Sequence, residues 1–228
     1  MKRSFICVGI LFSCFLMLPG QDIPVVPVKE YDQVSSEYLR DSLLDIYGSG
    51  KTLPDGYELQ VLIALSYYPE LKNARIQFVL DPHAFIPLSS RPKFFTMLRK
   101  KDKWIYKVVI SDKHGSKWND AMFRNLPFNA QIGVLGHELA HTAYYQKRGF
   151  WSMVGIGLRY PYGTFRARFE RDTDRRTIDY GLGWQLLDFA VYTHEKMKDK
   201  PGKMADYMSR FYLSPDEIIV YMQKTGLY

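Results

Sequence analysis

The sequence contains very little cysteine and no internal repeat or low-complexity tract. Its 228 residues include two cysteines, Cys7 and Cys14, and both lie in an apolar N-terminal segment. The remainder of the chain can therefore form neither disulfides nor cysteine-ligated metal sites, and its hydrophobic core has to stabilise the fold. The chain also lacks a basic motif with interleaved aromatic residues, so we expect no nucleic-acid partner.

The N-terminal apolar run is too short for a comfortable membrane span. It extends from Ser4 to Leu18, follows a basic start and precedes the small residue Gly20. This layout is typical of a secretory signal peptide, which we expect over residues 1–20. Two alternatives remain, lipidation at Cys14 and an uncleaved membrane anchor.

Cleavage after residue 20 sets the expected size and charge of the mature chain. Removing 20 of 228 residues leaves 208, and losing two basic residues lowers the net charge from +7 to +5. That length suits a single domain over residues 21–228. We expect an exported protein, periplasmic or extracellular in a bacterium, whose mild positive charge favours peripheral contact with an anionic membrane. The oligomeric state is not constrained.

An HExxH motif between Gly136 and His141 is the most specific signal in the chain. Residues four apart lie on one face of a helix, so His137 and His141 could present imidazole nitrogens to one metal ion. Glu138 lies between them, where it could take a proton from an activated water. The motif arises by chance in roughly one chain in a hundred of this length, so its surroundings have to support it.

The surroundings of the motif predict a mostly buried helix over residues 130–147. Asn129 suits the N-cap position, and Gly149 suits the C-terminal end behind two basic residues. Gly133 and Gly136 lower helix stability, which indicates that something approaches them closely. We expect a neighbouring strand near the metal face, with tight core packing as the alternative.

A catalytic zinc usually has three protein ligands and one open position. An extended HExxHxxGxxH site is excluded, because Tyr144 and Lys147 occupy the positions of its glycine and histidine. Three distant histidines remain as alternatives: His83, His114 and His194. The best candidate is Glu170, which lies 29 residues after His141.

Glu170 belongs to a second predicted helix, over residues 164–179, that also contains Asp174. The two acids are four residues apart and share a helix face. Asp174 could accept the outer N–H of a ligand histidine and orient its ring. The alternative for this segment is a charged, solvent-exposed helix of interleaved acids and arginines.

The combination of HExxH with a downstream glutamate resembles the gluzincin metallopeptidases. The ExxxDR string that begins at Glu170 is more similar still to the family of prenyl-protein and heat-shock membrane peptidases. The likeness covers about residues 129–148 and 164–183, and the long transmembrane helices typical of that family are absent from this sequence. The resemblance implies one zinc ion with three ligands, His137, His141 and Glu170. It also implies that Glu138 is the general base, but it does not carry over a substrate. From the peptidase chemistry we expect a peptide or protein substrate.

The order of the predicted elements favours an α+β fold of the zincin type, with a small mixed sheet ahead of the HExxH helix and a mainly helical second half. Strands are expected at 75–80 and as a hairpin formed by 93–99 and 104–111. Further helices are expected at 35–48, 57–68, 184–198 and 215–224. We interpret 104–111 as an edge strand that could pair with an extended peptide, with an ordinary inner strand as the alternative.

The sequence thus predicts an exported zinc metallopeptidase that also needs a donor for the oxyanion of its reaction intermediate. Four residues of the second half are candidates: His194, Tyr180, Tyr192 and Arg175. The apolar segment 150–158 is interpreted as a lid over the site, a membrane contact or part of the core. Two other functions remain open, a catalytically silent zinc-binding or interaction protein of the cell envelope, and a zinc hydrolase of non-peptide amides.

Overall fold

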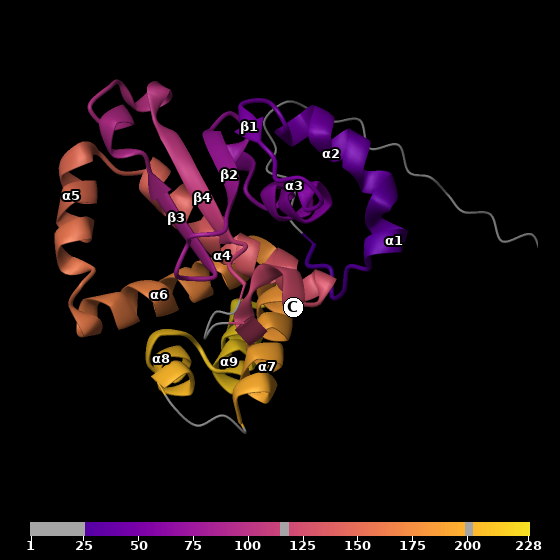
Figure 1. The fold of residues 1–228 in the computed structure, drawn as a ribbon. Coiled ribbons are helices and arrows are strands. Elements are labelled where there is room, and N and C mark those ends of the chain that lie inside the picture. The colour runs from indigo at the N-terminus through magenta and orange to yellow at the C-terminus, as the bar shows by residue number, and fades with distance from the viewer. Residues whose placement is uncertain (1–25, 115–118, 199–202) are drawn as a thin grey trace, which may run out of the picture.

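The computed structural model describes residues 26–114, 119–198 and 203–228 (Figure 1). The expected signal peptide and both cysteines lie outside these residues. Within the described ranges, none of the helices combines the length and the apolar character needed to cross a membrane.

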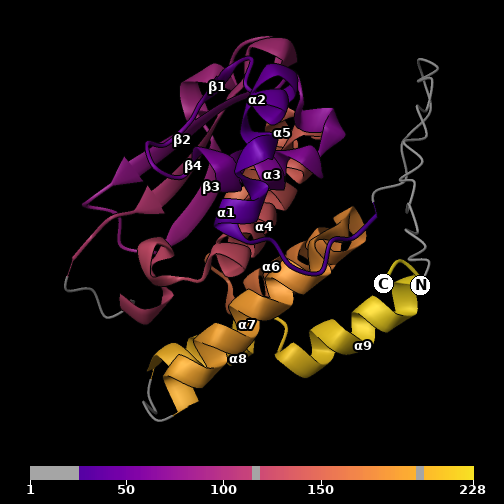
Figure 2. The ribbon, with the colours of Figure 1, turned by 90° about the vertical axis from the view of Figure 1, so that its right-hand side faces the viewer.

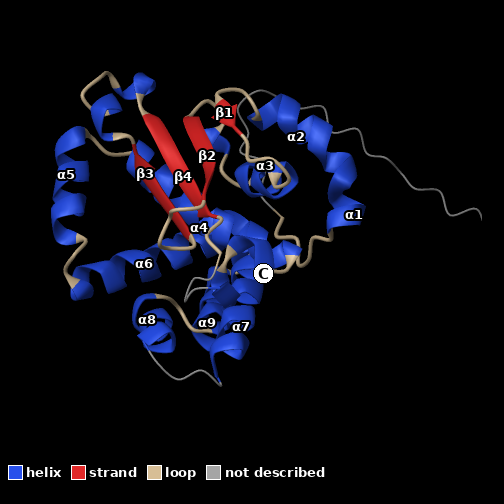
Figure 3. Cartoon of the chain, viewed as in Figure 1, coloured by secondary structure: helices blue, strands red, loops and turns tan. Residues whose placement is uncertain are grey.

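A four-stranded sheet occupies the upper part of the view in Figure 1. In spatial order its strands are β1 (Lys51–Thr52), β2 (Arg75–Asp81), β4 (Ile105–Ser111) and β3 (Leu88–Pro92). The first three run parallel, and β3 is antiparallel to β4. Together with the surrounding helices this sheet makes the fold α+β, as the sequence predicted (Figure 3).

The prediction that 104–111 is an edge strand is wrong. Val108 of β4 is paired with Phe78 of β2 on one side and with Ser90 of β3 on the other. Four consecutive β4 residues, 108–111, are buried, which is the pattern of an inner strand covered on both faces. The edge strand on this side of the sheet is β3.

The hairpin partner of β4 also lies elsewhere than predicted. The strand expected at 93–99 is replaced by β3, and residues 93–103 form a connection with two short 3₁₀ helices, η3 (Phe94–Thr96) and η4 (Lys101–Lys103). The Thr96 hydroxyl accepts a hydrogen bond from the Ile105 N–H and closes this connection. Phe94 and Phe95 are both exposed, so the segment lacks the alternation of a strand.

Helices precede and flank the sheet. The helix expected at 35–48 is divided into α1 (Gln33–Ser36), η1 (Glu37–Leu39) and α2 (Arg40–Tyr47). The buried helix expected at 57–68 is confirmed as α3 (Glu58–Ser66). Every α3 residue from Leu59 to Leu65 is buried, and the helix packs against α2 and α4.

The central helix α4 (Phe128–Gln146) contains the HExxH motif and packs against α3, α6, α7 and β3. Asn129 is not its N-cap, because Pro127 occupies that position and Asn129 already lies inside the helix. There the Asn129 side chain accepts the Tyr31 N–H and donates to Asp188, which connects α4 to the N-terminal segment and to α7. Gly149 does not end the helix either, since it stands directly before α5.

A helix, and not the expected strand, approaches the two glycines of α4. A Cβ atom on Gly133 would lie 2.2 Å from the backbone oxygen of Gln185 in α7. A Cβ atom on Gly136 would lie 2.5 Å from the Leu182 side chain. Tight core packing, the alternative to the strand, therefore explains these glycines.

The second half of the chain is helical, as Figure 2 shows, with elements α5 (Phe150–Arg159), α6 (Gly163–Thr177), α7 (Gly183–Lys198), α8 (Lys203–Phe211) and α9 (Pro215–Thr225). The helices expected at 164–179, 184–198 and 215–224 are confirmed as α6, α7 and α9. A π-helical segment, Ile178–Leu182, joins α6 to α7, and Gly181 permits the kink with its φ of 97°. The sequence did not predict α5 or α8 as helices.

Candidate metal centre

Three buried side chains from α4 and α6 converge on one point. His137 and His141 lie one turn apart on α4, and each places its Nε2 close to the same oxygen of Glu170, at 3.0 and 3.1 Å. The three candidate ligand atoms lie within 4.8 Å of one another. Ligands of a tetrahedral zinc are about 3.3 Å apart when each is about 2.0 Å from the ion. The group formed by His137, His141 and Glu170 could therefore hold a metal ion.

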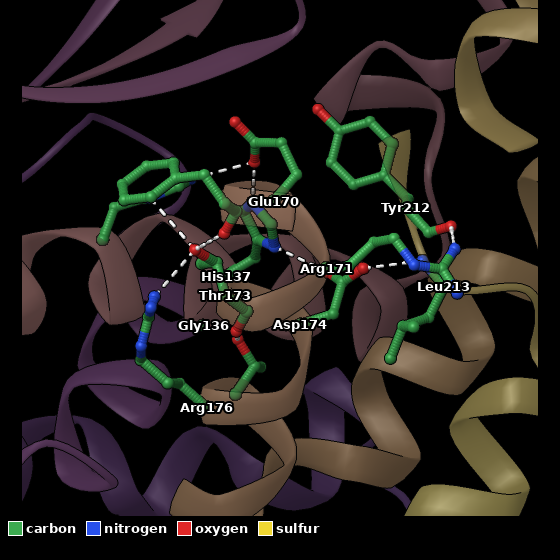
Figure 4. A network of polar contacts seen from close by, with 12 residues as sticks. Gly136, His137, Glu170, Arg171, Thr173, Asp174, Arg176, Tyr212 and Leu213 are labelled. Atoms are coloured by element: carbon green, nitrogen blue, oxygen red, sulfur yellow. Dashed lines mark hydrogen bonds and ion pairs between the residues drawn. The ribbon is translucent and has the colours of Figure 1, made fainter. Parts of the chain in front are cut away.

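Asp174 orients the first histidine, as Figure 4 shows. Its Oδ1 lies 2.8 Å from Nδ1 of His137, and its Oδ2 accepts the backbone N–H of Leu213 at 2.8 Å. Asp174 lies one turn after Glu170 on the buried face of α6, as the spacing predicted. The carboxylate thus fixes the ring of His137 and also connects α6 to the segment before α9.

Thr173 plays the corresponding part for the second histidine. Its hydroxyl donates to the Phe169 carbonyl and accepts an N–H from Arg176, so its single hydrogen is already committed. Nδ1 of His141, 3.3 Å away, must then be the donor in their contact. The ring of His141 is also stacked between those of Tyr145 and Phe169.

These hydrogen bonds decide where the protons of the two imidazoles lie. Each neutral ring carries one hydrogen, and in both rings that hydrogen is on Nδ1, directed at Asp174 or Thr173. Both Nε2 atoms then point a lone pair at the carboxylate oxygen of Glu170. Three acceptors facing one another without a hydrogen repel, so the arrangement calls for a cation between them or for an extra proton on the rings. The donor set therefore fits a divalent metal ion.

The electrostatics of the metal-free protein agree with this proton count. Burial lowers the pKa of His137, but hydrogen bonds and charge from Asp174 and Glu170 outweigh it and raise the pKa well above its ordinary value. Burial raises the pKa of Glu170, but the two histidines outweigh it and hold the pKa well below its usual range. The carboxylate stays ionised in a buried place, where its charge has to be compensated by a cation.

Glu138 belongs to the same surface but not to the ligand group. Its buried side chain accepts the backbone N–H of Ser90 in β3, and both residues line the cavity beside the histidines. Burial raises the pKa of Glu138 above its ordinary value. A carboxylate with a raised pKa is a better proton acceptor, because its proton affinity is closer to that of the working solution.

The site opens into a cavity of about 830 Å³ between the sheet edge and the helices of the second half. β3 and the residues before it form one wall, and Met153 and Ile156 of α5 form another. Phe189 of α7 and Tyr207 of α8 extend the lining. A cavity of this size with mostly apolar walls and a few convergent polar groups is typical of a ligand-binding site.

Comparisons with known proteins do not assign the chain to a family. No family model, curated protein or solved structure matches the chain.

The three histidines considered as alternative third ligands lie outside the metal-ligand group. His83 and His114 are exposed and do not join the ligand group. His194 is exposed and lines the cavity, but it is not one of the three grouped ligands. Of the four oxyanion candidates, His194 is thus the one that lines the cavity.

The other three oxyanion candidates have different contacts. The Tyr180 hydroxyl donates to Glu70, and its ring packs on Tyr68, outside the cavity lining. The Tyr192 hydroxyl donates to the Asn125 carbonyl. Arg175 is paired with Asp172 on the same helix.

Two tyrosines beside the site were not predicted from the sequence. The Tyr160 hydroxyl donates to Oε1 of Glu170, the oxygen that does not face the histidines. The ring of Tyr212 lies 5.7 Å from that of His137. Burial, with the charge of Glu170, raises the pKa of both, so both stay protonated donors. The chain has 17 tyrosines and no spacing rule distinguishes these two, so the sequence offered no signal for them.

Proposed function

We propose that this protein is a zinc-dependent metallopeptidase with a gluzincin-type catalytic core on a zincin-like α+β fold. The observation that carries the proposal is the convergence of two imidazole lone pairs and one ionised carboxylate, with Glu138 beside them in an open cavity. Two histidines and a carboxylate form a ligand set of catalytic zinc, and they leave room for a water.

His137, His141 and Glu170 would hold the metal, which would supply Lewis acidity toward a carbonyl group and a water molecule. Glu138 would accept the proton of that water and return it to the leaving amine. Asp174 and Thr173 would keep both histidines in the tautomer that offers Nε2, and Tyr160 would direct the free oxygen of Glu170 away from the site.

Peptide substrates are favoured by the position of the edge strand. β3 lines the cavity from Leu88 to Pro92, and its side away from β4 is not paired with another described strand. An extended chain could pair there by backbone hydrogen bonds, with its side chains reaching the apolar walls. The strand proposed for this role is β3 and not β4.

The test separates metal binding from turnover. We expect the wild-type full-length chain to bind one zinc ion and to cleave a peptide library. Glu138→Gln should keep its zinc and lose about 10² to 10⁴-fold in cleavage rate, because the proton acceptor is gone but the ligands remain. Glu170→Gln should lose zinc and cleavage together. Glu30→Gln, an exposed isosteric change, is the matched control and should behave as wild type.

Each other outcome contradicts a defined part of the proposal. Zinc in the wild type without cleavage of any peptide would favour a binding role. Hydrolysis of non-peptide amides alone would favour the other enzyme class. Full zinc content in Glu170→Gln would remove that residue from the ligand set.

A further inference from the structure

A group of large apolar side chains is exposed on one side of the molecule, beside the cavity. Phe94, Phe95 and Leu98 come from the connection between β3 and β4 and are 55%, 80% and 66% exposed. Trp151 and Leu158 come from α5 and are 81% and 70% exposed. We call these five residues the aromatic platform. Isolated exposed apolar residues are ordinary on protein surfaces, but contiguous ones indicate an interaction surface.

Ring contacts join the two halves of the aromatic platform. Phe94 lies 5.6 Å from Phe95 and 6.4 Å from Phe150, the first residue of α5. Phe150 in turn lies 5.2 Å from Trp151. The connection is also held against the end of α4, because the Lys101 ammonium donates to the carbonyls of Tyr145 and Arg148. Phe95, Phe94 and Trp151 are thus linked through Phe150, and Leu98 and Leu158 extend the platform along the same two segments.

α5 is apolar on two sides, which a helix that only covers the core does not need. Met153 and Ile156 are buried in the cavity wall. Trp151 and Leu158 are seven residues apart, so they share the opposite, exposed side. Ser152 and Arg159 are the only side chains in this helix that are neither apolar nor glycine. An outward apolar side of this kind is typical of helices that lie at a membrane interface.

Basic residues predominate around the aromatic platform, and Asp102 is the one acidic residue of the connection 93–103. Residues 82–101 and 139–169, which contain the platform and its supports, include no Asp or Glu and five Lys or Arg each. Lys93, Arg99 and Lys100 are exposed, and none forms an ion pair with a carboxylate among the described residues. Each such basic residue near an anionic bilayer contributes attraction that falls off within a Debye length.

We propose that the aromatic platform and its basic border dock on the surface of an anionic lipid bilayer. Phe, Leu and Trp side chains would enter the boundary between headgroups and acyl chains, and the lysines and arginines would contact the lipid phosphates. A protein partner would have to match the same surface with acidic groups and an apolar pocket, whereas an anionic bilayer offers both along its whole area. Such docking follows from exposure and charge and does not depend on catalysis.

The cavity shares residues with this surface. Phe94 and Met97 line the cavity from the connection, and Ile156 and Gly157 line it from α5. In Figure 1, α5 lies on the opposite side of the molecule from α1 and α2. Docking through the platform would therefore bring the cavity to the bilayer surface.

The test is vesicle binding by the full-length chain. We expect sedimentation with vesicles that mix phosphatidylcholine and phosphatidylglycerol to exceed that with pure phosphatidylcholine by roughly tenfold or more, and to weaken as salt is added. The triple variant Phe95→Ser, Trp151→Ser, Leu158→Ser should lose roughly tenfold or more of this binding. None of these three residues lines the cavity, so zinc content should not change.

Matched variants isolate the surface. Val34→Ser, Tyr38→Ser and Val220→Ser remove three other exposed apolar side chains and should leave vesicle binding unchanged. The N-terminal segment is the same in every variant, so a difference between the two triple variants belongs to the platform. Lys93→Glu with Lys100→Glu should weaken binding to the anionic vesicles only.

Two further measurements test whether Trp151 enters the bilayer and whether a second copy of the chain covers the platform. Quenching of tryptophan fluorescence by brominated lipid should fall in Trp151→Phe while vesicle affinity is largely kept. The proposal is overturned if the wild type binds neither vesicle, or if both triple variants bind as the wild type does. It is also overturned if the wild type does not bind vesicles and is a dimer in sedimentation velocity, while the platform variant is a monomer. The platform would then be occupied by a second copy of the chain.

Discussion

At the scale of single residues, two hydrogen atoms decide what the candidate centre can bind. Asp174 and Thr173 take the Nδ1–H of His137 and His141, so the Nε2 lone pairs are all that the rings can offer to Glu170. With both rings neutral, the three atoms that face one another are negatively charged overall and have no hydrogen between them. Residues that do not contact the cation would therefore contribute to its affinity.

Asp174→Asn is expected to weaken zinc binding by about 10- to 100-fold, because an amide orients His137 less strongly and does not increase the basicity of its Nε2. Competition with a chromogenic chelator measures this. Asp172→Asn, which changes a half-buried acid paired with Arg175 two residues away on the same helix, should bind zinc as the wild type does. Equal affinity in wild type and Asp174→Asn would show that the carboxylate has no part in the centre.

Zinc affinity should fall as the pH is lowered. In the metal-free protein the pKa of His137 is raised well above 6.5, so a proton occupies the ring below that raised pKa and has to leave before a metal binds. The stability of the metal-free fold changes with pH in the opposite direction. The raised pKa contributes stability that is fully present below pH 6.5 and is lost as the pH rises through the folded-state value. Zinc titrations and denaturant unfolding across this pH range test both directions, and a pH-independent affinity would contradict the proton count.

At the scale of elements, the centre depends on how closely α4 can approach α7. Gly133 and Gly136 remove the side chains that would separate these helices, and the kink at Gly181 turns the chain from α6 into α7. The backbone contact holds α4 from one side while Asp174 and Glu170 hold it from α6. The two candidate ligand histidines therefore lie on a helix that is packed against both α6 and α7.

Gly133→Ala is expected to destabilise the protein by about 1–3 kcal/mol, because the new methyl group would overlap the Gln185 backbone and force α7 away. Gly155→Ala in α5 is the matched control, since its nearest neighbour is an arginine nitrogen at 3.9 Å. There the same change should stabilise the helix by up to about 1 kcal/mol. Urea unfolding of both variants measures the difference, and effects of the same sign would refute the packing argument.

At the scale of the whole molecule, the proposed metal would join α4 to α6 and stabilise the fold by binding the native state alone. Free zinc at 100 times its Kd adds about 2.7 kcal/mol to the free energy of unfolding. For a chain of this length that corresponds to a rise in Tm of roughly 5–10 °C. Glu170→Gln should show no such rise in a thermal scan. An equal rise in both proteins would place the bound zinc elsewhere.

The fold also places two surfaces next to each other that are far apart in sequence. The connection after β3 and the helix α5 meet beside the cavity, and they supply both its wall and the aromatic platform. The interpretation of segment 150–158 as core is confirmed for the side of α5 that contains Met153 and Ile156, and the membrane contact is proposed for the opposite side. A lid role for this segment stays a prediction.

Local sequence patterns were sufficient to predict several secondary-structure elements and the candidate ligands. The HExxH helix, the shared face of Glu170 and Asp174, the strand at 75–81 and the last helix were predictable because each follows from spacing or capping within a few turns. The ligand candidates were predictable for the same reason.

Three features follow from the packing of distant segments alone: the strand at the sheet edge, the element that approaches the glycines, and the tyrosine that contacts Glu170. Strand order depends on pairing between segments distant in sequence, and nothing within 104–111 records how many neighbours it has. The tautomers of the two histidines likewise depend on Asp174 and Thr173, which lie more than 30 residues away in the chain. Sequence spacing specifies which groups share a face, whereas the partner that each group meets is set by how the faces pack.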